Sequence, residues 1–120
     1  MENNTKTLTG TAKEVVLAFV DALNKEDFTE AGTFLTSNMT FNGVLGTRDG
    51  AEAYMSDMEK MKFKYDIKKT IAEQNDVCLF CDIGMGAVTI DSCLWYHIKE
   101  GKISSLKAIF DPRPVLEQKK

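Results

Sequence analysis

The chain has 120 residues and a formal net charge of −3 at pH 7, and 43% of its residues are hydrophobic and 28% are charged. This length supports one domain with its own core and makes two domains unexpected, and the composition is ordinary for a soluble globular protein. Because domains that bind nucleic acid carry an excess of lysine and arginine, the acidic balance predicts no nucleic-acid partner.

The cysteines and the single histidine favour neither a disulfide framework nor a metal centre. Cys78, Cys81 and Cys93 are few and odd in number, which is typical of a reducing compartment. Cys78 and Cys81 have a CxxC spacing, but the run around them is typical of a strand, on which side chains three apart point to opposite faces. His97 has no companions for a zinc site, so we predict no metal and no cofactor.

The distribution of apolar residues also bears on location. The N-terminal segment lacks the apolar core of a signal peptide. No stretch approaches the roughly 20 apolar residues that a membrane span needs. We therefore predict a cytoplasmic protein without a membrane partner.

The first half of the chain has helical periodicity. Apolar residues between Val15 and Leu23 recur at helical spacing and predict a helix over 11–24, which Thr11 and Glu14 begin as a capping box. Asp27 is a candidate cap for the next helix. The elements predicted after it are a helix over 28–35, a strand over 39–42, a loop over 43–46 and a helix over 50–61 capped by Thr47 or Asp49.

The second half alternates between apolar and polar residues, which is typical of strands. Since helices come first and strands later, we predict an α+β fold with a largely antiparallel sheet. The predicted strands cover 63–73, 77–83, 88–98 and 103–110. The polar ends divide the chain into a disordered N-terminal tail over 1–10, a single domain over 11–114 and a C-terminal tail over 115–120.

Two hairpins determine which residues share a face of this sheet. A three-residue loop pairs Ile98 with Lys102, and a two-residue Met85-Gly86 turn pairs Ile83 with Val88. The inner face that both turns predict consists of Val77, Leu79, Cys81, Ile83, Val88, Ile90, Ser92, Leu94, Tyr96, Leu106, Ala108 and Phe110.

A register one residue away is the alternative. It would bring Asp82, Asp91 and His97 to the inner face as a group able to do acid–base chemistry. Burial of unpaired charges is unfavourable, so the first register is preferred. The opposite, outer face then carries Phe80, Trp95 and Ile109. We interpret it as a partner surface, the alternative being that these side chains are singly exposed or covered by the ends of the chain.

The order of elements resembles the NTF2-like superfamily, and within it the SnoaL-like group. The resemblance covers about 11–114 and rests on the first helix, the break at Glu26-Asp-Phe28, the run Gly46-Thr-Arg-Asp-Gly-Ala51 and the hairpin Glu100-Gly-Lys-Ile103. It implies a cystatin-like cone, in which three helices of the N-terminal half pack on a curved, mainly antiparallel sheet around a pocket. It also implies a homodimer through the outer sheet face, with Phe80, Cys93, Trp95 and Ile109 at the interface.

The superfamily contains isomerases, cyclases, dehydratases, epoxide hydrolases and non-catalytic binders, so the fold does not decide the function. Its steroid isomerase branch uses a tyrosine, a carboxylate base and a protonated carboxylic acid. The corresponding positions are Phe19, Gly43 and Leu94, or Asn42 and Cys93 for the last two after a one-residue shift. None of these side chains fits its role, so catalytic residues stay unassigned and enzyme activity stays open.

The candidate ligand-binding residues are those that we expect on the pocket wall: Asn42, Tyr54, Met58, Tyr65, Ser92, Tyr96 and Phe110. An apolar pocket with a few polar groups is typical of small-molecule sites. We therefore predict a protein that binds a small apolar molecule. One alternative is an enzyme of the isomerase, cyclase or dehydratase type acting on a carbonyl-containing or polycyclic substrate. The other is a dimer that acts through protein interaction alone.

Overall fold

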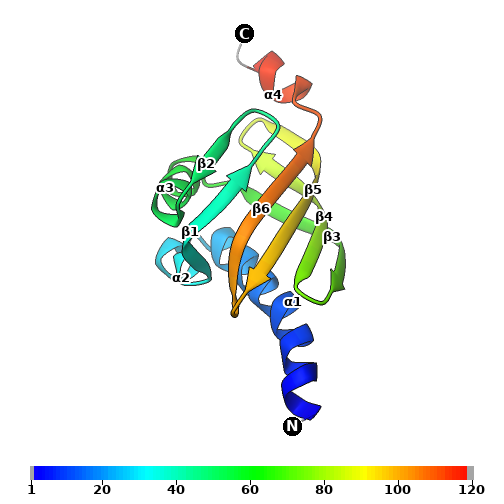
Figure 1. Cartoon of the computed structure of the whole chain (residues 1–120). Helices are drawn as coiled ribbons and strands as arrows, with labels where there is room; N and C mark the ends of the chain where they lie inside the picture. The colour runs from blue at the N-terminus through cyan, green and yellow to red at the C-terminus, as the bar shows by residue number, and fades with distance from the viewer. Residues whose placement is uncertain (1, 119–120) are drawn as a thin grey trace.

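The computed structural model describes the backbone of residues 2–118 and the side chains of residues 12–117. Its six strands form one curved, mainly antiparallel sheet, and α1 and α3 pack against the face on which the core lies (Figure 1). The predicted α+β class, with helices packed on a curved and mainly antiparallel sheet, is thus confirmed. The elements in chain order are α1 (Glu2–Asn24), α2 (Phe28–Gly32), β1 (Leu35–Asn42), β2 (Thr47–Asp49), α3 (Ala51–Met61), β3 (Lys64–Glu73), β4 (Asp76–Met85), β5 (Val88–Lys99), β6 (Lys102–Phe110) and α4 (Arg113–Gln118).

The sheet has the strand order β2-β1-β6-β5-β4-β3. Strands β3 to β6 follow one another as antiparallel hairpins, whereas β1 pairs in parallel with β6. The apolar stripe of α1, formed by Val16, Phe19, Val20 and Leu23, is fully buried against this sheet. None of the helices in the described part of the chain is long and apolar enough to cross a membrane.

The helix boundaries correct the sequence prediction at three places. Helix α1 begins at Glu2, so Thr11 lies within the helix and the predicted capping box is wrong; the side chain of Thr11 itself is outside the described ones. Once a buried stripe has formed a helix, each added residue gains one hydrogen bond, so the helix extends into a polar segment. Helix α2 ends at Gly32, three residues early, and α3 begins after Gly50 without a side-chain cap.

Other boundaries follow the prediction or add to it. The Asp27 carboxylate accepts a hydrogen bond from the Glu30 backbone N–H at 3.2 Å, so the predicted cap of α2 is confirmed. Strand β2 and helix α4 are additional elements, and both are short and mostly exposed, so neither has an apolar period. The predicted division into one domain and two tails stays a prediction.

The two predicted hairpins are misplaced, yet the predicted residues lie on the inner face. The β4–β5 pairing is shifted by two residues, and the β5–β6 pairing by one residue at the turn and by two beyond it. The β4–β5 turn is Gly86-Ala87, so Ile83 pairs with Ile90, and Gly86 has the positive φ of 78° that this turn needs. The β5–β6 hairpin turns at Glu100-Gly101, and an irregularity beside His97 shifts the pairs beyond it. Because side chains alternate with a period of two, a shift of two residues leaves both faces unchanged.

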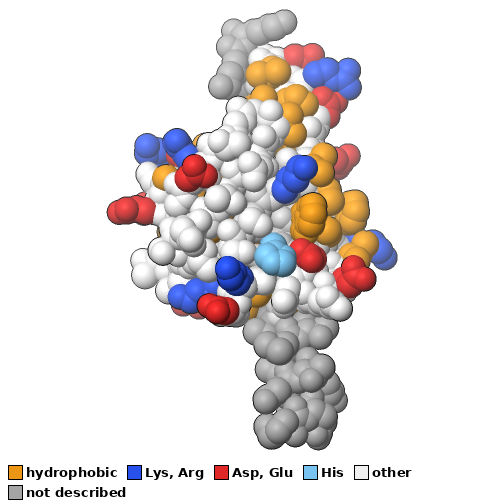
Figure 2. Space-filling model, viewed as in Figure 1, with side chains coloured by type: hydrophobic (Ala, Val, Ile, Leu, Met, Phe, Trp, Pro, Cys, Tyr) orange, Lys and Arg blue, Asp and Glu red, His pale blue; other side chains and the backbone are white. Residues whose placement is uncertain are grey.

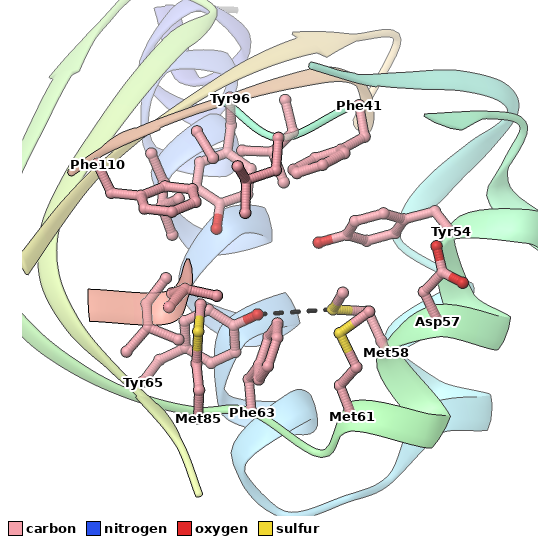
Figure 3. Close-up of a pocket in the computed structure, with 16 residues that line it drawn as sticks. Phe41, Tyr54, Asp57, Met58, Met61, Phe63, Tyr65, Met85, Tyr96 and Phe110 are labelled. Atoms are coloured by element: carbon pink, nitrogen blue, oxygen red, sulfur yellow. Dashed lines mark hydrogen bonds between the residues drawn. The ribbon is translucent and has the colours of Figure 1, made fainter. Parts of the chain in front are cut away.

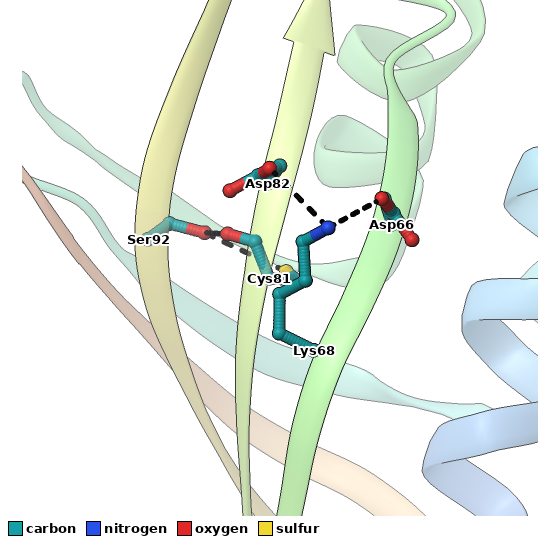
Figure 4. Close-up of polar contacts among 5 residues, drawn as sticks. All are labelled: Asp66, Lys68, Cys81, Asp82 and Ser92. Carbon is teal, nitrogen blue, oxygen red and sulfur yellow. Dashed lines mark hydrogen bonds and ion pairs between the residues drawn. The ribbon is translucent and has the colours of Figure 1, made fainter.

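The predicted inner face is confirmed by burial. Ten of its twelve residues are buried, and Val88 and Phe110 are half-buried. The alternative register is wrong, because Asp82 pairs with Asp91 on the outer face and His97 is exposed. Figure 4 shows the same alternation locally: the Ser92 hydroxyl donates to the Cys81 carbonyl oxygen at 2.9 Å, while the next residue, Asp82, forms an ion pair outside.

Candidate ligand cavity

A cavity of about 400 Å³ lies between the inner face of the sheet, α3 and the start of α4. This volume is within the range of small-molecule sites. Figure 3 shows its side chains converging from several elements on one space. The sixteen lining residues are Phe41, Leu45, Tyr54, Asp57, Met58, Met61, Phe63, Tyr65, Ile83, Met85, Leu94, Tyr96, Leu106, Ala108, Phe110 and Val115.

All three tyrosines of the chain line this cavity. Tyr96 comes from β5 and packs edge-to-face on Phe19 of α1, with ring centroids 6.3 Å apart. Tyr54 comes from α3, and its ring lies 5.4 Å from that of Phe41 in β1. The Tyr65 hydroxyl donates to the Met58 sulfur at 3.6 Å. Burial raises the pKa of each of the three phenols, so all are neutral hydrogen-bond donors at neutral pH.

One side of the cavity is held to α1 by the Asn24 side chain. Its Nδ2 donates to the Tyr65 carbonyl oxygen at 2.9 Å, and its Oδ1 accepts from the Tyr65 N–H at 2.7 Å. The chain then turns away from α1 through Glu26, which has a positive φ of 59° and forms an ion pair with Lys64. These contacts fix the start of β3, and with it Tyr65, against the end of α1.

The one acidic residue among the lining residues is Asp57 of α3. Both of its carboxylate oxygens are occupied by the Arg48 guanidinium, at 2.6 Å from Nε and 3.0 Å from Nη2. These hydrogen bonds hold the pKa of Asp57 below its usual value. The carboxylate is therefore a weak base, and its charge is compensated within the chain.

Five of the seven predicted ligand-binding residues line the cavity: Tyr54, Met58, Tyr65, Tyr96 and Phe110. Their role in binding stays a prediction. Asn42 lies instead at the exposed end of β1, where it borders a smaller hollow of about 240 Å³ beside Trp95 and His97. Ser92 is on the inner face, as predicted, but its hydroxyl is bonded to the neighbouring strand and it is not a lining residue.

Sequence reasoning missed several lining residues, of which Asp57 matters most. Asp57 follows Tyr54 by three residues and precedes Met58, so its helical spacing puts it beside the apolar stripe of α3. That spacing was the signal from which Asp57 could have been predicted as a lining residue. Val115 could not be found in this way, because α4 follows the predicted end of the domain.

The positions that correspond to steroid isomerase catalytic groups contain no acid or base in the structure. Phe19 is fully buried in the core against Tyr96. Gly43 lies in the turn between β1 and β2, where its N–H donates to the Gly46 carbonyl oxygen. Leu94 lines the cavity but has no polar atom on its side chain.

The outer face carries an exposed apolar patch made of Ile71, Cys78, Phe80, Cys93, Trp95 and Ile109, which we call the outer patch. These residues form two adjacent rows across β3 to β6, because Ile71 pairs with Cys78 and Cys78 with Trp95, while Phe80 pairs with Cys93 and Cys93 with Ile109. Phe80, Trp95 and Ile109 are 43%, 46% and 50% exposed. Figure 2 shows hydrophobic side chains gathered beside the histidine on this side.

Polar residues hold the tryptophan of the outer patch in place. The Trp95 indole Nε1–H donates to the Asp76 carboxylate at 2.9 Å, and the same oxygen lies 2.9 Å from Nδ1 of His97. Both bonds lower the pKa of Asp76, the one to His97 more strongly. The indole ring is therefore held in one orientation although nearly half of it is exposed.

The chain belongs to the SnoaL-like domain family, which matches residues 16–106. It is similar to an NTF2-like protein of unknown function from Cytophaga hutchinsonii, with 50% identity, a TM-score of 0.86 and coverage of 88% of this chain and 94% of the other. The comparison with curated proteins gave no match.

Two further solved structures share the fold at low identity. Bal32a, from a soil-derived mobile gene cassette, is 16% identical with a TM-score of 0.82, covering 91% of this chain and 96% of its own. An LEH-like epoxide hydrolase of M. tuberculosis is 20% identical with a TM-score of 0.78, and the match covers 91% of this chain and 89% of the other. At these identities the likeness concerns the architecture alone.

Proposed function

We propose that this protein binds a small apolar molecule in the cavity between the sheet and α3. The observation that carries the proposal is the chemistry of the lining. Among its sixteen residues, Asp57 is the one acid, it is already paired, and no lysine, arginine or histidine is present. Exchange of water for an apolar ligand in an apolar space of about 400 Å³ is favourable.

The same lining favours binding over catalysis. Acid–base catalysis needs a group whose pKa lies near the working pH and that reaches the reacting atoms. Asp57 has a lowered pKa and is held by Arg48, and burial raises the pKa values of the tyrosines. The relative from M. tuberculosis is described as an epoxide hydrolase, a reaction that needs an activated water, and these side chains offer no base for that step.

The test is to fill the cavity from within. Ala108→Phe adds a ring to a buried lining residue of β6, whereas Ala87→Phe adds the same ring to an exposed hairpin turn. The probe is the neutral fluorophore N-phenyl-1-naphthylamine, whose emission increases in an apolar site. We expect saturable binding to the native chain and to A87F, and at least a 10-fold loss in A108F. Equal binding to all three proteins, or no binding to any, would refute the proposal.

We also propose that the chain forms a homodimer through the outer patch. Monomeric proteins rarely expose contiguous apolar surface of this kind, and aromatic residues are enriched at interfaces. Trp95→Glu puts a charge in the centre of the patch, whereas Thr89→Glu puts the same charge on an exposed position of β5 outside it. Sedimentation velocity should give a dimer for the native chain and T89E and a monomer for W95E. A native monomer would refute this proposal.

The predicted cytoplasmic location stays a prediction.

A further inference from the structure

Two of the three phenol groups in the cavity have no hydrogen-bond partner among the described residues. The Tyr65 hydroxyl is bonded to the Met58 sulfur, and this is the one hydrogen bond drawn among the lining residues in Figure 3. The Tyr54 and Tyr96 hydroxyls point into the cavity, one from α3 and the other from β5. A phenol donor in an apolar space is unfavourable until an acceptor reaches it.

Both donors are fixed before any ligand arrives. The Tyr96 ring meets Phe19 edge-to-face at 73°, and the Tyr54 ring packs on Phe41. Tyr54 and Tyr96 are 3% and 1% exposed, so neither side chain can turn towards solvent. Donors that are already ordered lose little conformational entropy when an acceptor binds, and they define its position.

The charge that the cavity can accept follows from the same residues. A carboxylate buried there would find no cation on the cavity wall, because no lining residue carries a positive charge, and Arg48 is bound to the lining residue Asp57. Burying an unpaired charge is far more unfavourable than burying a neutral carbonyl. A carbonyl oxygen has two lone pairs and can accept from two donors.

We propose that the cavity selects an uncharged apolar ligand bearing a carbonyl oxygen that accepts hydrogen bonds from the Tyr54 and Tyr96 hydroxyls, and that it discriminates against anionic amphiphiles. This inference rests on the proposed binding function and narrows it to one chemical class. It assigns Tyr54 and Tyr96 to specificity, whereas the remaining lining residues provide the apolar contact.

Three probes of one skeleton separate the contributions. 2-Acetylnaphthalene carries the carbonyl, 2-isopropenylnaphthalene replaces its oxygen by a methylene group, and 2-naphthoate carries a negative charge at neutral pH. Each is titrated calorimetrically into the native chain and into Tyr54→Phe, Tyr96→Phe and Tyr65→Phe. The last variant is the matched control, because it removes a phenol oxygen from the same cavity that is already bonded to Met58.

We expect Y54F and Y96F each to weaken the binding of 2-acetylnaphthalene by about 3- to 10-fold, which is the range for the loss of one neutral hydrogen bond. The affinity for 2-isopropenylnaphthalene should change by less than 2-fold in both variants. Y65F should change the affinities for the ketone and for the methylene probe by the same factor. The native chain should bind 2-naphthoate at least 10-fold more weakly than the ketone. A perturbation of the tyrosine absorbance by the ketone alone provides a second readout.

The outcomes separate this inference from the function on which it rests. If none of the three compounds and no N-phenyl-1-naphthylamine binds, the proposed function fails. If the apolar probes bind but the variants weaken ketone and methylene probes equally, binding stands and carbonyl recognition is refuted. An effect of only one tyrosine refutes the shared acceptor, and tight binding of 2-naphthoate refutes the discrimination against anions.

Discussion

The contact between Asn24 and β3 allows a quantitative test of what holds the cavity together. Asn24→Ala removes two hydrogen bonds, of 2.7 and 2.9 Å, which join residues 41 positions apart in the chain. Each such bond contributes about 0.5–1.5 kcal/mol, and the half-buried N–H and carbonyl of Tyr65 lose their partner. We therefore expect the free energy of unfolding to fall by about 2 kcal/mol, a large part of the stability of a domain this size.

Urea unfolding followed by the fluorescence of Trp95, the only tryptophan, measures this change. The slope of the free energy against urea should stay constant, because the variant exposes the same surface on unfolding. Asn42→Ala is the control, since Asn42 is exposed at the end of β1, and it should change stability by no more than about 0.5 kcal/mol. A loss below about 0.5 kcal/mol in N24A would mean that the amide does not anchor β3. N24A should also bind the cavity probe more weakly, because Tyr65 is held by the same contact.

Three further predictions concern ionisation and turn geometry. Burial raises the pKa of all three tyrosines, so their absorbance in the folded chain should not change near pH 10, where unfolded tyrosines ionise. The stability of the fold should decrease as the pH rises above that value, because the unfolded chain then loses protons that the folded chain retains. Because Arg48 lowers the pKa of Asp57, the ion pair stabilises the fold above the pKa of an unfolded aspartate, and this stabilisation is lost as the pH falls through the lower pKa of the folded state. In urea titrations, Asp57→Asn should therefore reduce stability at pH 7 more than at pH 3. Equal losses at the two pH values would contradict this. Glu100 and Gly101 have φ of 54° and 82°, a geometry that asparagine tolerates better than glutamate. Glu100→Asn should therefore raise the free energy of unfolding by about 0.5 kcal/mol. A loss of stability would contradict the turn assignment.

The faces of the sheet could be predicted from the sequence because they depend only on parity. Neither hairpin was placed at its correct residues, yet Tyr96, Leu94 and Ile83 were assigned to the inner face, since the pairs of these three residues are shifted by two. Burial of Asp82 and Asp91 in the alternative register would have been unfavourable, so charge supported the register that both turns predicted.

The cavity could be predicted only in part, because its lining combines local pattern with distant contacts. Tyr54 and Met58 belong to a helical stripe that the sequence displays, whereas Asn42, which a one-residue shift aligns with the isomerase base position, lies at the exposed end of β1. Ser92 was assigned to the correct face, but its partner is a backbone carbonyl, and a residue pattern carries no information about which acceptor a hydroxyl reaches.

The parallel pairing of β1 with β6 has a consequence for biosynthesis. Ribosomes make the chain from its N-terminus, so Leu35 and Met39 of β1 emerge well before the strand that covers them, which begins at Lys102. The hairpins from β3 to β6 involve near neighbours in the chain and can assemble as they appear, while β1, which pairs with β2 and β6, cannot join the rest of the sheet until the last strand is complete. The nascent protein therefore carries β1 without its β6 partner until the end of synthesis, whereas α1 can pack against β3 and β4 as soon as these strands form.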